Sequence, residues 1–158
     1  MWLFKSKLER ALDREQENFR KFLLYCLYEV AAADGVEDSE LEWLYEVIEK
    51  HGISPRDLKN LKKDVKKSQI TMPADQEARE FIVQMMIRMS LSYQVVTRPE
   101  VYKAMHLTEE MGLDPASVPE MLKSIVQEGE GSDDEEERAR VAEVASVVDS
   151  YIDTREAR

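Results

Sequence analysis

Residues that interrupt helices are scarce in this chain, and this scarcity constrains its fold more than any other feature. The 158 residues include five glycines and five prolines, about half of the roughly 12% that these two residues make up in typical proteins. Between the interruptions, hydrophobic residues recur at steps of three and four, and no segment shows sustained alternation of polar and apolar residues. We therefore expect an all-α fold without a sheet, a compact orthogonal bundle of about seven helices.

The few glycines and prolines also mark where helices end and begin. Glycine readily adopts the left-handed conformation that ends a helix, so we expect helices to end at Gly35, Gly52 and Gly112. Proline suits the first turn of a helix, which places helix starts at Pro55 and Pro115. A second helix is expected between the first two of these glycines.

The sequence contains an internal repeat. Residues 21–63 fall on residues 81–123 when they are shifted by sixty positions without a gap. The shift brings Gly52 onto Gly112, and the two proline helix starts also coincide. We expect two related three-helix units around a pseudo-two-fold axis, followed by a C-terminal helix.

One low-complexity segment lies near the C-terminus. Residues 128–137 hold seven acidic residues and no basic residue, and such a segment repels itself and buries nothing. We therefore divide the chain into a helical domain at 1–127, an exposed acidic linker at 128–137 and an amphipathic C-terminal helix at 138–158. That helix must cover its apolar side, and it either packs on its own bundle or mediates dimerisation or partner capture.

Composition excludes several classes of function. The formal net charge of −11 argues against nucleic acid as a partner. Cys26 is the single cysteine, which removes disulfides and cysteine-based zinc sites, and we expect a buried, inert thiol. His51 and His106 have no second ligand at metal-binding spacing, and no nucleophile or phosphate-binding motif is found. No apolar run reaches the roughly 20 residues of a membrane span. We expect a cytoplasmic protein that is not an enzyme.

An acidic loop is the strongest candidate for a binding site. Asp34, Glu37, Asp38 and Glu40 lie within seven residues around Gly35. Ca²⁺ takes six to eight oxygen ligands, of which this loop supplies a part. The same residues also suit a helix start, where one side chain caps and the other acids complement the positive helix end. Both interpretations stay open.

Two further segments each allow two interpretations. Residues 53–70 hold six basic and two acidic residues without an aromatic residue, which is typical of a solvated face or of a docking face for an acidic partner. At the N-terminus, Trp2, Leu3 and Phe4 precede Lys5. This start either packs back on the bundle or contacts a membrane surface.

The acidic loop also carries a family resemblance. The run Ala-Ala-Ala-Asp-Gly-Val-Glu-Asp-Ser-Glu at residues 31–40 precedes an amphipathic helix that ends Glu-Lys-His-Gly-Ile-Ser-Pro at residues 49–55. This pattern resembles the tellurite-resistance TerB family, whose relatives include the TerB-like domain of the membrane-anchored J-protein DjlA. The match covers about residues 20–126. It implies a duplicated all-helical fold and a bacterial stress response near membrane complexes. The second half lacks the Asp-Gly step and keeps Glu100.

These observations lead to one hypothesis and one alternative. The hypothesis is a TerB-like, non-enzymatic module of a bacterial stress response that binds protein partners, in the cytoplasm or peripheral to the inner membrane. It includes weak binding of Ca²⁺ or another divalent cation by a set of five acids, Asp34, Glu37, Asp38, Glu40 and Glu100. The alternative is an adaptor without metal that binds through the basic third helix or the C-terminal helix, the latter also offering a homodimer contact.

The cation hypothesis makes a measurable prediction. Carboxylates crowded into one turn repel each other, and a cation relieves that repulsion. Because the second half lacks matching acids, we expect a dissociation constant no tighter than about 10⁻⁴ M. At ten times that concentration, Ca²⁺ should stabilise the fold by about 1.4 kcal/mol, and Asp34→Asn with Glu37→Gln should abolish the rise in melting temperature. If the melting temperatures of wild type and of the double variant respond equally to millimolar cation, the loop is a helix cap.

Overall fold

A computed structural model of the chain describes residues 2–33, 55–92, 97–128 and 135–156. Within these ranges the chain is all-α and has no strand, which confirms the expected fold class. The expected helix between Gly35 and Gly52 lies outside the described residues, which hold six α-helices against about seven expected. The elements are α1 (Trp2–Ala32), α3 (Pro55–Lys66), α4 (Gln76–Ser92), α5 (Arg98–Glu110), the 3₁₀ turn η1 (Pro115–Ser117), α6 (Val118–Glu128) and α7 (Glu135–Glu156).

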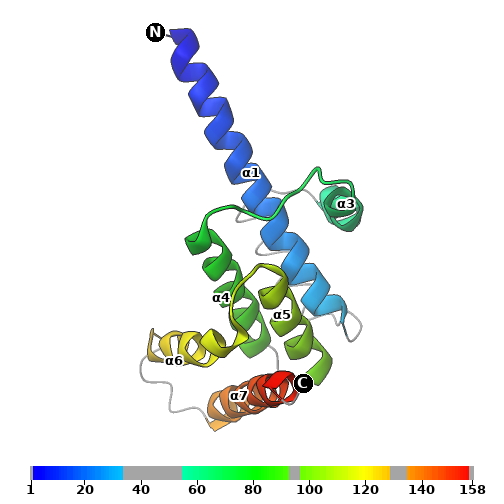
Figure 1. Ribbon diagram of the computed structural model, residues 1–158, viewed down its shortest axis with the longest axis vertical. Coiled ribbons are helices and arrows are strands. Elements are labelled where there is room, and N and C mark those ends of the chain that lie inside the picture. Colours follow the sequence, from blue (N-terminus) through cyan, green and yellow to red (C-terminus); the bar gives the residue numbers. More distant parts are fainter. Residues whose placement is uncertain (1, 34–54, 93–96, 129–134, 157–158) are drawn as a thin grey trace.

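Helix α1 is the element on which the bundle is assembled (Figure 1). Helices α3, α4 and α5 all pack on it. Figure 1 shows α4 and α5 alongside the C-terminal half of α1, with α3 crosswise on another side. Helices α6 and α7 pack on each other and on α4, and α7 also packs on α5. The result is a bundle in which the last two helices lie across the earlier pair.

The hydrophobic core lies where these helices meet. The C-terminal half of α1 contributes six residues without exposed surface, Leu23, Leu24, Cys26, Leu27, Val30 and Ala31. Helix α4 contributes Ile82, Met86 and Met89, also fully buried, and α5 contributes Val101 and Met105. Cys26 is therefore buried as expected. These positions recur at three- and four-residue steps, and this spacing is why the sequence pattern predicts an all-α fold.

The N-terminal half of α1 stands apart from the bundle. Its 31 residues span about 46 Å at 1.5 Å per residue, and its first turns extend beyond every other described helix (Figure 1). The helix joins the bundle at Asn18, whose amide donates to the Thr71 carbonyl at 2.7 Å and accepts from the Thr71 N–H at 2.9 Å. Beside it, the rings of Phe19 and Phe81 lie 6.0 Å apart. Residues 2–4 begin this helix, and the two interpretations of them, packing back or membrane contact, concern side chains that the structure does not describe.

Two helices end in the same hydrogen-bonding pattern. After α5, Gly112 has φ +76° and donates to the Glu109 carbonyl at 2.9 Å, while Leu113 donates to the Thr108 carbonyl at 3.2 Å. These bonds satisfy carbonyls that the helix leaves unpaired. Gly112 is the helix-ending glycine that the sequence predicts. After α3 the left-handed position is occupied by Ser68, with φ +61°. Because this residue is not a glycine, the sequence does not predict the helix end there.

Helix α7 begins at Glu135, three residues before the expected start at 138. The last three residues of the expected linker are therefore helical. Glu135, Glu136 and Glu137 form the first turn, where negative side chains are favoured by the positive end of the helix dipole. Arg140 then donates to the Leu91 carbonyl at 3.0 Å and so bonds the start of α7 to the end of α4.

The apolar side of α7 is covered within the chain. Val144, Val147, Val148 and Tyr151 are 2–8% exposed against α4, α5 and α6. The C-terminal helix thus packs on its own bundle. A homodimer contact through this helix stays a prediction, and the residues available for it are those outside this buried face.

The two expected repeat units are described in part. Helix α3 falls on η1 and α6 under the sixty-residue shift, and the end of α1 falls on α4. Each third helix packs on its first helix, α3 on α1 and α6 on α4. The second helix of the first unit lies outside the described residues, so the superposition of whole units stays a prediction.

The docking of α7 can be tested with a double substitution. Val144→Asp with Val148→Asp places two charges in the core, and we expect the free energy of unfolding to fall by at least about 3 kcal/mol. The matched control is Ala142→Asp with Ser146→Asp, which adds the same charges four residues apart at exposed positions of α7. Chemical denaturation followed by circular dichroism measures both. Equal stability of the two variants would show that α7 is not anchored by this face.

Candidate functional site

The acidic loop falls mostly outside the described residues. Asp34, Glu37, Asp38 and Glu40 belong to that segment, so the structure does not report whether they converge. Glu100 is described: it lies in the first turn of α5 and is 2% exposed. Among the described residues there is no group of three or more His, Cys, Asp or Glu placed to hold a metal. The cation site stays a prediction.

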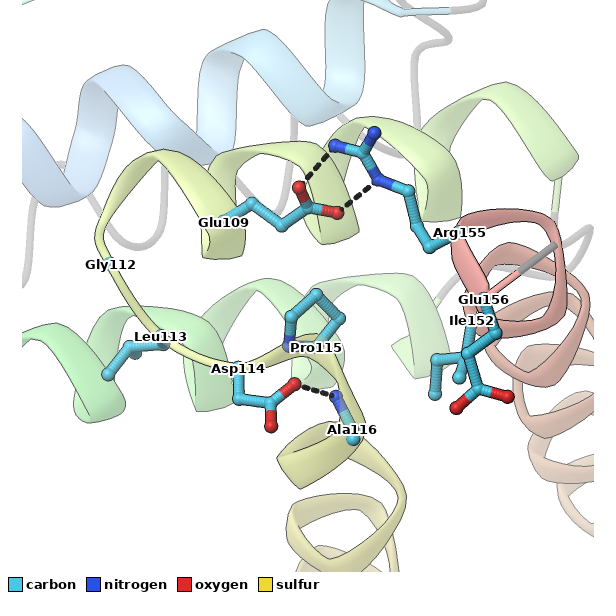
Figure 2. Close-up of a pocket in the computed structure, with 9 residues that line it drawn as sticks. All are labelled: Glu109, Gly112, Leu113, Asp114, Pro115, Ala116, Ile152, Arg155 and Glu156. Atoms are coloured by element: carbon cyan, nitrogen blue, oxygen red, sulfur yellow. Dashed lines mark hydrogen bonds and ion pairs between the residues drawn. The ribbon is translucent and has the colours of Figure 1, made fainter. Parts of the chain in front are cut away.

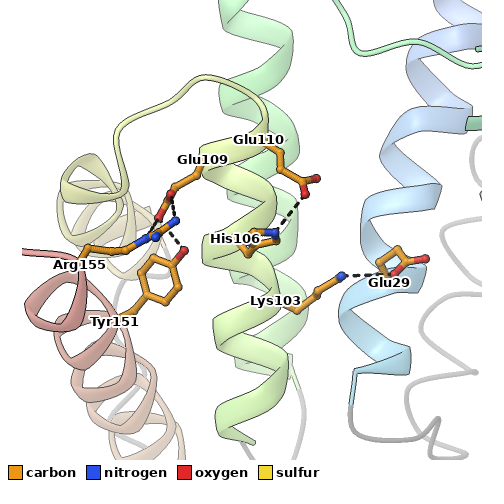
Figure 3. A network of polar contacts seen from close by, with 7 residues as sticks. All are labelled: Glu29, Lys103, His106, Glu109, Glu110, Tyr151 and Arg155. Carbon is orange, nitrogen blue, oxygen red and sulfur yellow. Dashed lines mark hydrogen bonds and ion pairs between the residues drawn. The ribbon is translucent and has the colours of Figure 1, made fainter. Parts of the chain in front are cut away.

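A buried carboxylate connects three helices near the end of α1. Glu29 is 8% exposed, and its two oxygens lie 3.6 Å from Nζ of Lys62 on α3 and 3.6 Å from Nζ of Lys103 on α5. Figure 3 shows the Lys103 contact from α5 to α1. The sequence pattern did not single out Glu29. The available signal was its position as a lone acidic residue on the apolar stripe of a helix. Glu29 also borders a cavity of about 700 Å³ that Tyr28, Tyr102 and other side chains line.

A second polar cluster fixes the end of α7 on α5 (Figure 3). Glu109 receives hydrogen bonds from Tyr151 Oη at 2.6 Å and from Arg155 Nε at 2.7 Å, and a second Arg155 nitrogen bonds its other oxygen. The Arg155 hydrogen bonds hold the pKa of Glu109 below its usual value. Burial, with the bond to Glu109, raises the pKa of Tyr151. The cluster therefore favours ionised Glu109 and neutral Tyr151 at neutral pH.

A cavity of about 520 Å³ adjoins this cluster (Figure 2). It is bordered by the 112–116 connection and by the last turn of α7. Three of its charged residues bond to protein groups, since Glu109 binds Arg155 and the Asp114 carboxylate accepts the Ala116 N–H at 3.0 Å. The latter bond caps η1, as expected for a helix start at this position. We interpret this cavity as structural.

An apolar groove of about 500 Å³ runs between α6 and α7. Its lining includes Pro119, Leu122 and Val126 of α6 and Val141, Ala145 and Val148 of α7, with the charged residues Lys123 and Asp149. Val126 is 42% exposed, and where side-chain exposure is described (residues 16–33, 60–91, 97–127 and 135–156) the other exposed large hydrophobic residues are Met72 and Phe81. Sequence analysis singled out the helices but not the groove, because α6 and α7 meet only in the folded chain.

The two helices that form this groove carry net negative charge. The described residues 118–128 and 135–149 hold seven acidic and three basic residues, a formal charge of −4. Glu137 lies four residues before Val141, so both occupy the same side of α7 within one turn. An apolar surface set in an acidic field selects apolar ligands that carry positive charge.

The remaining candidate residues have ordinary structural environments. Burial raises the pKa of the Cys26 thiol, which keeps it protonated and unreactive at neutral pH. His106 is exposed, and its Nε2 lies 3.1 Å from a Glu110 oxygen one turn along α5. On α3, Lys62, Lys63 and Lys66 are exposed, which leaves the basic face of that helix accessible.

Comparison of the chain with family models, curated proteins and solved structures finds no match. The resemblance to the TerB family therefore stays a prediction that rests on residues 31–40 and 49–55. Among the described helices, none is long and apolar enough to cross a membrane.

The Glu109 cluster predicts a specific pH dependence. Because the folded pKa of Glu109 is lowered, ionised Glu109 contributes stability that is complete above the ordinary carboxyl value, near 4.5. That contribution disappears as the pH falls through the lowered pKa. Glu109→Gln should therefore be less stable than wild type at pH 7, and the difference should shrink toward pH 3. Urea unfolding at several pH values measures it, with exposed Glu143→Gln as the control. A difference that does not change with pH would contradict the assignment.

Proposed function

We propose that this chain is a non-catalytic helical module that binds protein partners, and that it holds an amphipathic helix of its partner in the groove between α6 and α7. The observation that carries the proposal is the groove itself, with Val126 42% exposed between two packed helices. Beside Val126, the groove residues Pro119, Val141 and Ala145 are partly exposed. Exposed apolar surface costs free energy in water, and burying it against a partner recovers that free energy.

The shape of the groove favours a helix as ligand. Two packed helices leave a furrow between them, and a third helix fits there through apolar residues at positions i, i+3 or i+4 and i+7. An extended strand needs a free sheet edge, and the described residues contain no sheet. The negative charge of residues 118–128 and 135–149 adds a preference for basic residues beside the apolar stripe of the ligand.

Several features support a binding role over catalysis. Among the described residues no group of three or more His, Cys, Asp or Glu is placed to hold a metal ion, and the single cysteine is buried. The proposal also fits the adaptor alternative in which the C-terminal helix takes part in binding. The resemblance to the TerB family adds to it a bacterial stress response and a weakly bound divalent cation at the loop that follows α1, with buried Glu100 as one ligand.

The proposal is tested with designed peptides of about 16 residues. The first peptide is an amphipathic helix with lysines beside its apolar stripe, and the second carries glutamates in their place. We expect the lysine peptide to bind with a dissociation constant of about 10 μM and the glutamate peptide at least tenfold more weakly. Val126→Asp should weaken binding of the lysine peptide at least tenfold. Fluorescence anisotropy of labelled peptide gives these constants.

A matched control separates the groove from general charge effects. Ser124→Asp adds the same charge at an exposed position on α6, and we expect it to bind as wild type within about twofold. Unchanged binding by Val126→Asp would refute the groove as the site. Tighter binding of the glutamate peptide, lost in Lys63→Glu with Lys66→Glu, would support the alternative in which α3 receives an acidic partner.

A further inference from the structure

We propose that the cavity beside Glu29 binds a small anionic ligand with a flat apolar body. The cavity has a volume of about 700 Å³ and is lined by residues of α1, α3, α5 and α7. It is separate from the α6–α7 groove, and the proposal does not depend on the function proposed for that groove. Its basis is the opening of the cavity to solvent, the excess of N–H donors in it and the aromatic side chains of its lining.

The first observation is that the cavity has the size of a ligand site and reaches solvent. Sites for small molecules typically have volumes of about 300–1,000 Å³. Glu29 and Tyr151, each 8% exposed, form the buried part of the lining. The other part is open, because five of the lining residues are exposed, Ala32, Ala33, Lys62, Pro99 and His106. The cavity thus combines a buried wall with an entrance from solvent.

The second observation is that two ammonium groups in the cavity share one carboxylate. Nζ of Lys62 and Nζ of Lys103 each lie 3.6 Å from an oxygen of Glu29, and Figure 3 shows Lys103 reaching from α5 toward α1. This separation is longer than a direct hydrogen bond, and each ammonium group has three N–H donors. An anionic group of a ligand can therefore accept from both lysines without breaking a short hydrogen bond.

The third observation is that the lining is positive although the chain is strongly negative. The lining holds two lysines and one glutamate, a formal charge of +1, whereas the whole chain has a formal charge of −11. A concave surface of one sign of charge concentrates ligands of the opposite sign. The cavity therefore favours an anion at a place where the rest of the chain does not.

The fourth observation is that three tyrosines line the cavity, Tyr28, Tyr102 and Tyr151. Aromatic side chains pack well against a flat apolar ligand. They also bind cations over their faces, but here two of the rings already do so within the chain. Arg98 lies 4.8 Å from the ring centroid of Tyr102. Arg155 lies 5.6 Å from the ring centroid of Tyr151.

These contacts decide between an anionic and a cationic ligand. A cation would compete with the two arginines for the tyrosine rings and with the two lysines for the buried carboxylate. An anion meets no such competition, because the lysines have donors to spare. The structure thus favours a ligand whose flat body contacts the tyrosines and whose carboxylate or similar group reaches Lys62 and Lys103.

Three probes with the same ring system and different charge test the proposal. They are 2-naphthoate, the neutral 2-naphthalenemethanol and the cationic 2-naphthylmethylammonium, each titrated into the full chain and followed by ¹⁵N NMR. We expect 2-naphthoate to bind with a dissociation constant of about 100 μM, and the neutral and cationic probes at least tenfold more weakly. The largest shift changes should fall on the amides of residues 28–33 and 99–106.

Substitutions of single lysines identify the groups that hold the anion. Lys62→Gln and Lys103→Gln each remove one ammonium group, and we expect each to weaken 2-naphthoate binding at least fivefold. The matched control is Lys63→Gln, which removes the same charge from an exposed position of α3 outside the cavity lining and should bind within about twofold of wild type. Circular dichroism checks that each variant keeps its helices, and Lys62, with a side chain 62% exposed, is the substitution that least disturbs the fold.

Several outcomes would overturn the proposal. They are no binding of 2-naphthoate at 5 mM, binding of the cationic probe as tight as that of the anion, or an equal loss in Lys63→Gln. Val126→Asp in the α6–α7 groove should leave 2-naphthoate binding unchanged. Loss of binding in that variant would place the probe in the groove and refute the cavity as the site, without contradicting the function proposed for the groove.

Discussion

The fold depends on the burial of one helix face, the stripe along the C-terminal half of α1. Six of its residues have no exposed surface, and α3, α4 and α5 pack on this half of the helix. Each Å² of apolar surface that this face removes from water contributes about 25 cal/mol to stability. Helix α7 then packs on α4 and α5, so its position depends on the earlier helices being in place.

Polar side chains fix the relative positions of helices that hydrophobic packing brings together. Glu29 joins α1 to α3 and α5 through two lysines, and Glu109 joins α5 to the last turns of α7 through Tyr151 and Arg155. Glu29 is buried and Glu109 is partly buried. Removing a carboxylate from water is costly without partners, so each of these acids favours the arrangement that supplies them. Hydrophobic contacts alone tolerate sliding of one helix along another, whereas these ion pairs and hydrogen bonds specify the register.

Much of the fold, but little of the candidate site, was predictable from the sequence. The all-α class and the helix end at Gly112 could be predicted, because both depend on residues that are close together in the sequence. Helical periodicity spans a few residues, and a helix-ending glycine directly follows its helix. Ser68 plays the same helix-ending part without a glycine, and no local signal distinguishes it from other serines. The start of α7 at Glu135 was not predicted, because a run of acidic residues is equally typical of a linker and of a first helical turn. The groove joins Val126 to Val141 and Ala145, and such a surface exists only after two helices pack.

The length of α1 has a consequence for how its first turns are held. Asn18 and Phe19 anchor the helix on Thr71 and on Phe81 of α4. A helix adds residues cooperatively to turns that already exist, so the turns before Asn18 elongate from an anchored template and need no nucleation of their own. Loosening the contact at Asn18 therefore removes the template of the preceding half, and fraying would spread along the backbone from residue 2 inward.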